Sequence, residues 1–237
     1  MSNKRDIFYE EVFWALNKAK IDYVVCGGVA VILYGFARLT VDLDLIVGLE
    51  KENLEKVYDL LNKLNYKPKT PIKKEEFIDK EKLRKLAEEK NMKVVSFYNL
   101  KDPLKVVDIC VNLPKISEIL KRKGYIKVKN LTIPIISIDR LIEMKKTLAR
   151  PQDLIDVENL KKIKKDYNPP TASSHSSLRS ERAPKAINEH LIYILKKSTP
   201  YQRMVWLKKA FEFWKNLKKK KFNLKNKKYS KDIILRD

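Results

Sequence analysis

The apolar residues of this chain recur with two periods, one typical of strands and one typical of helices. Short apolar runs bounded by charged or turn residues predict strands, and apolar positions three and four residues apart predict amphipathic helices. The expected strands are 22–26, 41–47, 93–99 and 104–111, with a hairpin over 125–135 around Lys129-Asn130. The expected helices are 5–19, 28–35, 51–64, 79–89 and 116–122, followed by a helical pair over 138–165. This alternation predicts an α+β domain in which helices flank a small mixed β-sheet.

The C-terminal part of the chain differs from this domain in composition. Residues 168–184 are rich in Ser and Pro and predict a flexible linker after a first domain of residues 1–167. Apolar spacing then predicts a helical hairpin over 185–217, in which Thr199 caps the second helix, followed by a basic tail over 218–237. Two helices of this length can hardly bury a core of their own. We therefore expect the hairpin to dock on the first domain, to dimerise or to bind a partner.

The most informative stretch, residues 23–47, contains two glycines and two acids. Gly27-Gly28 ends one apolar run, and Asp42 and Asp44 lie within the next. Residues i and i+2 of a strand point to the same face, so the two carboxylates would lie side by side. Burying two unpaired carboxylates is costly, whereas Mg²⁺ binds one or two carboxylates together with substrate phosphates. Backbone amides at glycines can approach a polyphosphate closely, which suits the same chemistry.

A third acid, Asp108, interrupts the apolar run 104–111. Val107 and Ile109 point to one face of this expected strand, and Asp108 points to the other. An acid within a β-branched run has no reason in strand propensity to be there. Either it lies at a strand edge and points to water, or it completes a triad with Asp42 and Asp44.

Two glycines, thirteen further residues and then Asp42-x-Asp44 in an apolar strand resemble the core motif of the nucleotidyltransferase superfold, the DNA polymerase β-like family. Residues 34–40 are similar to the form found in small prokaryotic members, including nucleotidyltransferase toxins of the AbiEii type. The resemblance covers about residues 5–165. It implies a nucleotidyltransferase core in which the first two acids hold two Mg²⁺ ions and Asp108 shares the ion that activates the attacking hydroxyl. Two such ions clamp the entering and leaving oxygens of an in-line displacement.

A further block resembles the C-terminal signature of the same small enzymes. It consists of Lys145, Arg150, Asp153 and Asp156 on two consecutive helices. The resemblance implies that Lys145 neutralises triphosphate charge and that the Arg/Asp pair pins the helices together. The adjacent Lys146 could carry the phosphate contact instead, and the block is equally compatible with an ordinary salt-bridged helical joint.

The remaining nucleotide contacts are assigned to the glycines and to one arginine. Gly27 and Gly28 are expected to hold the triphosphate. Arg38 lies just before the strand of the acid pair. It is expected either to contact phosphate or to form a surface salt bridge.

The charge of the chain favours a polyanionic partner. The 237 residues include 52 Lys and Arg against 30 Asp and Glu, a net charge of +22. Residues 183–237 alone hold 16 basic and four acidic residues. Such an excess attracts nucleic acid. A Lys- and Ile-rich composition is also typical of thermophile or AT-rich genomes, which would explain part of the charge without a function.

Several site classes are disfavoured by composition. No apolar run approaches the roughly 18–20 residues of a membrane span, and the N-terminus lacks the apolar stretch of a signal peptide. We expect a cytoplasmic protein with no membrane partner. Cys26 and Cys110 fall in expected buried strands and are interpreted as reduced core thiols. Two histidines in the whole chain argue against histidine metal chemistry and a Ser-His-Asp triad.

The sequence thus predicts a Mg²⁺-dependent enzyme that transfers NMP from an NTP to a hydroxyl acceptor. Charge and resemblance favour tRNA or another RNA as the acceptor, as in a toxin, with an antitoxin as a conceivable partner of residues 185–217. A small-molecule acceptor, as in antibiotic nucleotidyltransferases, is the alternative, and a protein side chain is also open. Two non-enzymatic hypotheses are a catalytically silent nucleotidyltransferase fold used for binding and a plain basic RNA-binding protein. The triad argues against both.

Overall fold

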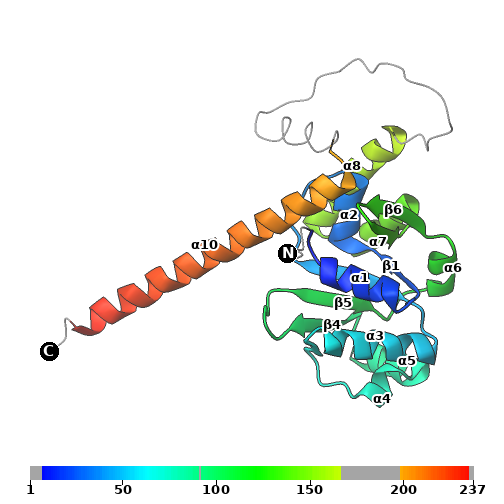
Figure 1. Ribbon diagram of the computed structural model, residues 1–237, viewed down its shortest axis with the longest axis horizontal. Helices are drawn as coiled ribbons and strands as arrows, with labels where there is room; N and C mark the ends of the chain where they lie inside the picture. The colour runs from blue at the N-terminus through cyan, green and yellow to red at the C-terminus, as the bar shows by residue number, and fades with distance from the viewer. Residues whose placement is uncertain (1–6, 91, 167–197, 235–237) are drawn as a thin grey trace.

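The computed structural model describes residues 7–90, 92–166 and 198–234 of the chain (Figure 1). Seven strands form one mixed sheet in the order β3-β4-β5-β2-β1-β7-β6. Their bounds are β1 Tyr23–Val25, β2 Asp42–Val47, β3 Tyr66–Pro68, β4 Val94–Asn99, β5 Val106–Cys110, β6 Gly124–Val128 and β7 Leu131–Ile135. The pairs β2–β5 and β1–β7 are parallel, and the others are antiparallel. The predicted α+β class with a mixed sheet is confirmed.

The helices were largely anticipated by apolar spacing. Their bounds are α1 Glu10–Lys18, α2 Gly27–Tyr34, α3 Lys51–Lys63, α4 Lys74–Phe77, α5 Lys80–Glu89, α6 Ile116–Lys121, α7 Ile138–Leu148, α8 Pro151–Asp166 and α10 Pro200–Ile234. Sequence reasoning missed β3 and α4, which are too short to show a period. None of the helices in the described ranges combines the length and apolar composition needed to cross a lipid bilayer.

The first helix begins later than its apolar pattern predicts. We expected a helix from residue 5, whereas α1 begins at Glu10 because Tyr9 adopts a left-handed conformation with φ 56° and ψ 24°. Such a conformation is unfavourable for a residue with a large side chain and is incompatible with a right-handed helix, so the helix starts only after Tyr9. The Tyr9 side chain is fully buried.

Burial alternates along the central strands and distinguishes the two faces of the sheet. On β4, Val95 and Phe97 are buried, whereas Ser96 and Tyr98 are partly exposed. On β5, Val107 and Ile109 are fully buried on the face opposite Asp108. Because side chains of a strand alternate between faces, the acids lie on the less covered face of the sheet.

The helical pair α7–α8 has the caps that its sequence predicts. The Ser137 hydroxyl accepts a hydrogen bond from the Arg140 amide, and the helix ends at Ala149, which is left-handed with φ 49°. Pro151 then opens α8, since its fixed φ suits a first helical position. The two helices pack against each other, and α8 also contacts α2, whose first residue is Gly27.

The C-terminal helix α10 is part of the main core. The predicted cap is present, because the Gln202 amide donates to Thr199 Oγ1 at 3.2 Å and Gln202 Oε1 accepts from the Thr199 amide at 2.7 Å. Met204, Leu207 and Phe211 are buried in the same cluster as the sheet residues. The part of the expected hairpin that the structure describes, from residue 198, therefore docks on the first domain.

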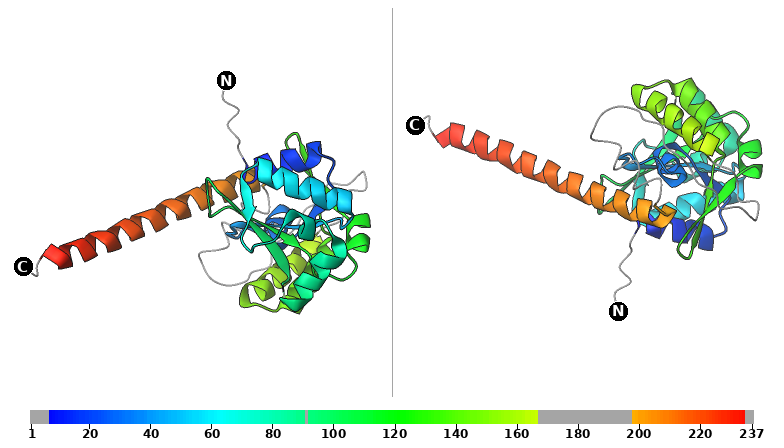
Figure 2. Two further views of the ribbon diagram at one scale, coloured as in Figure 1. Left: turned by 90° about the horizontal axis from the view of Figure 1, so that it is seen from below. Right: turned by 90° about the horizontal axis from the view of Figure 1, so that it is seen from above.

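The boundary expected at residue 217 is not seen in the backbone. Helix α10 continues to Ile234 and projects from the body of the protein, as all three views show (Figures 1 and 2). The expected linker 168–184 and the first helix of the expected hairpin, 185–197, lie outside the described residues.

Candidate active site

The structure brings the three predicted carboxylates together on one face of the sheet. Strands β2 and β5 pair in parallel, with Asp44 directly opposite Asp108 and Asp42 opposite Val106. Paired residues share a face, and Asp42 shares it because it is two residues before Asp44. Ser96 of β4 lies opposite Asp108 on its other side, so this hydroxyl joins the same face. The spacing in the sequence predicts that Asp42 and Asp44 share a face, and the strand register places Asp108 on that face beside Asp44.

Burial and the neighbouring negative charges raise the pKa values of Asp42 and Asp44. Burial, followed by the charges of Asp108 and Asp42, raises the pKa of Asp44 to about 6, although the Gly28 amide and Lys145 oppose the shift. Burial and Asp108 likewise raise the pKa of Asp42, against an opposing contribution from Lys69. This face of the sheet therefore carries more negative charge than its surroundings neutralise. A cation bound between the carboxylates would remove that repulsion.

The donor set fits a hard divalent cation. Oδ1 of Asp108 is buried and has no hydrogen-bond partner. A buried carboxylate oxygen without a partner is costly, and a cation would satisfy it. Carboxylate oxygens are the protein ligands that Mg²⁺ prefers. Among the described residues, no group of three or more His, Cys, Asp or Glu side chains is placed so that it could hold a metal ion as it stands, so a bound ion would need the acids to move toward it.

Neither Gly27 nor Gly28 has room for a side chain, and a different neighbouring residue occupies the space in each case. Gly27 has φ +60°, and a Cβ there would lie 1.8 Å from Oδ2 of Asp44. A Cβ on Gly28 would lie 2.6 Å from Oγ1 of Thr40, in the segment that leads into β2. The Gly28 amide hydrogen bonds to the Asp44 carboxylate. The glycine turn thus lies directly against the acid that the sequence motif pairs with it.

Lys145 lies in a buried ion-pair network rather than on an open surface. Its Nζ is 3.0 Å from Asp153 Oδ1 and 2.7 Å from Asp156 Oδ2, and its side chain is 5% exposed. Arg38 completes the network by pairing with Asp156 at 2.6 Å. The charge of Lys145 still lowers the pKa of Asp44. Its expected contact with the triphosphate stays a prediction, while its role in joining α7 to α8 is observed.

Arg150 is the more accessible cation of this block. Its Nε donates to Asp153 Oδ2 at 2.7 Å, and its side chain is 70% exposed. The charges of Asp44 and Arg150 interact, since Asp44 contributes to the raised pKa of Arg150. Although burial alone would raise the pKa of Asp153, the ion pairs with Arg150 and Lys145 lower it, so this carboxylate stays ionised. Asp153 therefore anchors an exposed guanidinium beside the acids.

Sequence reasoning missed Lys69 as a neighbour of the acids. Its charge lowers the pKa of Asp42, and its amide donates to the Ser96 carbonyl at 2.8 Å. Lys69 follows β3, which is three residues long and pairs with β4. Neither the strand nor its position in the sheet has a signal in the sequence, so nothing in the sequence indicated this lysine.

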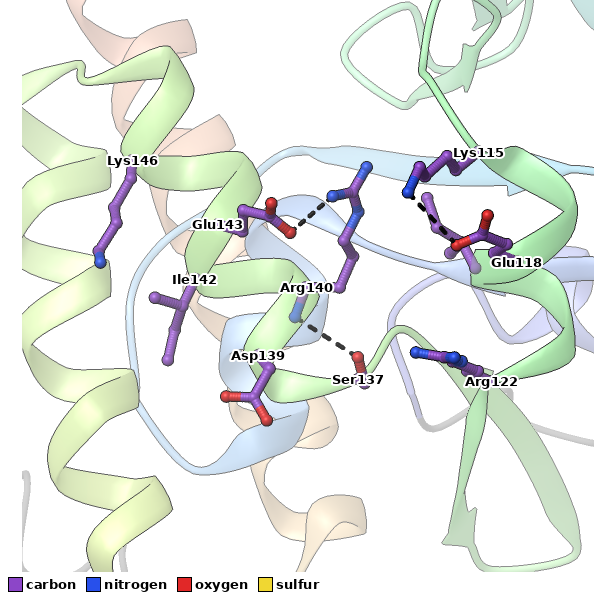
Figure 3. Close-up of a pocket in the computed structure, with 10 residues that line it drawn as sticks. Lys115, Glu118, Arg122, Ser137, Asp139, Arg140, Ile142, Glu143 and Lys146 are labelled. Atoms are coloured by element: carbon purple, nitrogen blue, oxygen red, sulfur yellow. Dashed lines mark hydrogen bonds and ion pairs between the residues drawn. The ribbon is translucent and has the colours of Figure 1, made fainter.

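Lys146 belongs to a different surface. Together with Arg122 and Arg140 it lines a groove of about 530 Å³ between α6 and α7 (Figure 3). None of the three acids lines that groove. Several of its charges are satisfied within it, for example Arg140 by Glu143 at 2.6 Å. Of the two adjacent lysines, Lys145 is the one whose charge acts on the acids.

Cys26 and Cys110 are buried, unoxidised thiols, as the sequence predicts. Their sulfur atoms are 3.9 Å apart. The hydrogen bond to Cys110, together with burial, raises the pKa of Cys26 well above its usual value. Both pack as small core side chains close to the acid-bearing strands.

Comparisons with known proteins complete the description. Neither a family model nor a curated protein matches this sequence. Among the solved structures that are similar to it, three cover about two thirds of the chain. A lincosamide antibiotic adenylyltransferase bound to lincomycin has 17% identity and a TM-score of 0.46, covering 67% of this chain and 99% of its own.

The other two structures are comparably distant. A protein of Thermotoga maritima assigned as a nucleotidyltransferase has 14% identity and a TM-score of 0.41, over 67% of this chain and 91% of its own. An antigenic nucleotidyltransferase-like protein of Paracoccidioides brasiliensis has 12% identity and a TM-score of 0.43, over 68% of this chain and 75% of its own.

Proposed function

We propose that this chain is a Mg²⁺-dependent nucleotidyltransferase that transfers NMP from an NTP to a hydroxyl group. One observation carries the proposal. Asp44 and Asp108 face each other on paired strands, with Asp42 beside them and a buried Asp108 oxygen that has no partner. Three carboxylates on one face, of which Asp42 and Asp44 have raised pKa values, destabilise the fold unless they serve a ligand, and divalent cations with a triphosphate are the ligands that fit.

The reaction follows from the positions of these groups. Asp42 and Asp44 would hold two Mg²⁺ ions, and Asp108 would share the one nearer the acceptor. The bound ions would neutralise the triphosphate and make the acceptor hydroxyl more acidic. The hydroxyl oxygen then forms a bond to the α-phosphorus as the bond to the β-phosphate oxygen breaks, pyrophosphate leaves, and the hydroxyl proton passes to Asp108.

The triphosphate would lie between the glycine turn and the start of α8. Gly27 and Gly28 allow the backbone to approach it, and the exposed guanidinium of Arg150 interacts electrostatically with Asp44. An Arg fork suits phosphate oxygens. In this arrangement Lys145 and Arg38 act mainly through their ion pairs with Asp153 and Asp156, which fix the α7–α8 joint that presents Arg150.

RNA is the acceptor that the charge favours. The net charge of +22 and the concentration of basic residues in the C-terminal part would hold a polyanion near the acids. Modification of an essential RNA would make the enzyme toxic to its own cell, and an antitoxin would then be a natural partner. An enzyme that uses NTP and RNA and keeps two free thiols belongs in the cytoplasm.

The deciding experiment is label transfer. The protein is incubated with each α-³²P-labelled NTP, Mg²⁺ and either total cellular RNA or a panel of small hydroxyl compounds. We expect labelled RNA with at least one NTP, and no transfer by Asp42→Asn, Asp44→Asn or Asp108→Asn. Label on a small molecule would replace the RNA acceptor. Equal transfer by wild type and all three variants would show that the active site is assigned wrongly. If wild type neither transfers label nor binds NTP, the proposed enzymatic function is wrong.

A further inference from the structure

The buried hydroxyl of Tyr9 connects the two strands that carry the acids. Its oxygen lies 2.7 Å from the Val41 carbonyl oxygen and 2.8 Å from the Val106 carbonyl oxygen, to either of which its proton can be donated. It also accepts a hydrogen bond of 2.8 Å from the Val106 amide. One side chain from the start of α1 thus satisfies backbone groups of two other segments.

These backbone groups belong to the first rung of the catalytic strand pair. Val41 directly precedes Asp42, and Val106 is the residue paired with Asp42 in the β2–β5 ladder. Asp108 follows two residues after Val106 on the same face. The separation of β2 and β5 at this end therefore determines how far the Asp42 carboxylate lies from that of Asp108.

Tyr9 reaches this position only through an unusual backbone. Tyr9 is left-handed and directly precedes α1, and its side chain reaches the backbone of Val41 and Val106. Left-handed geometry in a bulky residue persists only where its surroundings enforce it. At Tyr9 these surroundings are the Phe8 ring, which packs edge-on with centroids 4.4 Å apart, and the backbone groups that bond its hydroxyl.

The C-terminal helix completes this support. Phe211 of α10 packs on Phe8 with ring centroids 4.9 Å apart, and both rings are buried. Lys215 of α10 pairs with Asp102 at 2.6 Å, in the loop between β4 and β5. Residues near the two ends of the chain therefore meet beside the entry to β5.

We propose that Tyr9 is a positioning residue that sets the spacing of Asp42 and Asp108, and that docking of α10 on Phe8 holds it in place. The inference rests on the proposed function. Its central feature is the juxtaposition of one buried hydroxyl with the backbone of both acid-bearing strands. Loss of the hydroxyl weakens the pairing of β2 and β5 at Asp42 and Val106, so the carboxylates bind the metal with lower affinity. The nucleotide contacts at the glycine turn and Arg150 remain.

The test compares Tyr9→Phe with Tyr23→Phe. Both variants keep a buried ring and lose a buried hydroxyl, but the Tyr23 hydroxyl bonds only to Asn17 Oδ1 at 2.9 Å among the contacts described. We expect Tyr9→Phe to weaken Mn²⁺ binding, measured by electron paramagnetic resonance, on the order of tenfold, and to lower kcat with little change in the KM for NTP. Tyr23→Phe should leave both values at wild-type level.

A double-mutant cycle tests the contribution of α10. Phe211→Leu keeps an apolar core residue but removes the ring contact with Phe8, and it is combined with Tyr9→Phe. We expect the double variant to change kcat and Mn²⁺ affinity by less than the sum of the two single effects, because both substitutions act on the same pairing of β2 with β5. Additive effects would overturn the role of α10.

The outcomes separate this inference from the proposed function. Wild type that binds Mn²⁺ and transfers label, with Tyr9→Phe unchanged in both, overturns the positioning role alone. An equal loss in Tyr23→Phe would show a general stability effect and would also overturn it. Wild type that binds no Mn²⁺ overturns both the metal-dependent function and the inference.

Discussion

Gly27 lies so close to Asp44 that a Cβ on residue 27 would be 1.8 Å from the carboxylate oxygen Oδ2. The glycine turn and the acid are therefore parts of one structure. Any side chain at residue 27 must displace the carboxylate, and the left-handed φ of +60° adds backbone strain of about 1 kcal/mol for a residue other than glycine.

Gly27→Ala is expected to abolish metal-dependent label transfer and to lower thermal stability, because the new methyl group displaces the Asp44 carboxylate. Gly124→Ala is the matched control, since a Cβ there meets Ile135 Cγ2 at an ordinary 3.6 Å. The measurements are the label-transfer rates and melting temperatures of both variants and of wild type. A fully active Gly27→Ala protein would mean that the Asp44 carboxylate does not need its present position.

The stability of the metal-free protein should decrease as the pH rises from about 4 to about 7. The pKa of Asp44 is raised to about 6, so the folded protein holds this proton more tightly than the unfolded chain, where the pKa is about 3.9. Stability from this group is therefore greatest below pH 4 and is lost as the pH passes 6. The effect is on the order of 2 kcal/mol, and Asp42 adds to it in the same direction.

Asp44→Asn isolates that contribution. At pH 7.5 without metal, the variant should be more stable than wild type, since the neutral amide removes the repulsion and its oxygen can still accept from Gly28. Below pH 4 the difference should vanish, and Mg²⁺ should stabilise wild type only. Denaturant unfolding across pH provides the measurement, and a wild type more stable than Asp44→Asn at pH 7.5 without metal would contradict the expectation.

Lys145→Met should destabilise the fold strongly and not merely weaken nucleotide binding. Removing this cation leaves Asp153 and Asp156, both buried, with one fewer partner each. Losing one member of a buried charge network costs about 3 kcal/mol. Lys146→Met, on the neighbouring exposed position, should change stability by less than about 0.5 kcal/mol. If Lys145→Met kept wild-type stability and lost only NTP affinity, the direct phosphate contact would be the better account.

Two truncations should separate the docked and projecting parts of α10. Deleting residues 218–237 removes eight lysines of the helix beyond the docked part and should leave the melting temperature nearly unchanged. RNA affinity should fall, with a shallower dependence on log salt as phosphate contacts are lost.

Deleting residues 199–237 should instead unfold or aggregate the protein. This truncation removes Met204, Leu207 and Phe211 from the core, each worth about 1.5–3 kcal/mol of burial. Their loss is a large share of the 5–15 kcal/mol that stabilises a typical domain. A stable protein lacking residues 199–237 would show that the contact between α10 and the first domain is dispensable.

The sequence by itself determined the class of the fold and the identity of the acids. Apolar periodicity is a local property, so β2, α3, β5 and the α7–α8 pair could be read from it with small errors at their ends. The i, i+2 spacing fixed Asp42 and Asp44 on one face, because alternation along a strand needs no knowledge of its neighbours. The glycine pair and the cap at Thr199 were likewise local signals.

Only the tertiary structure decided which distant groups meet. Strand register placed Asp108 opposite Asp44, and the order of the sheet brought Lys69 beside Asp42 through a strand too short to predict. Packing enclosed Lys145 between two carboxylates, brought Phe211 onto Phe8, and placed the Tyr9 hydroxyl on the backbone of the acid-bearing strands. These contacts join residues far apart in the chain. They depend on the free energy of packing the whole core, which no local pattern of residues encodes.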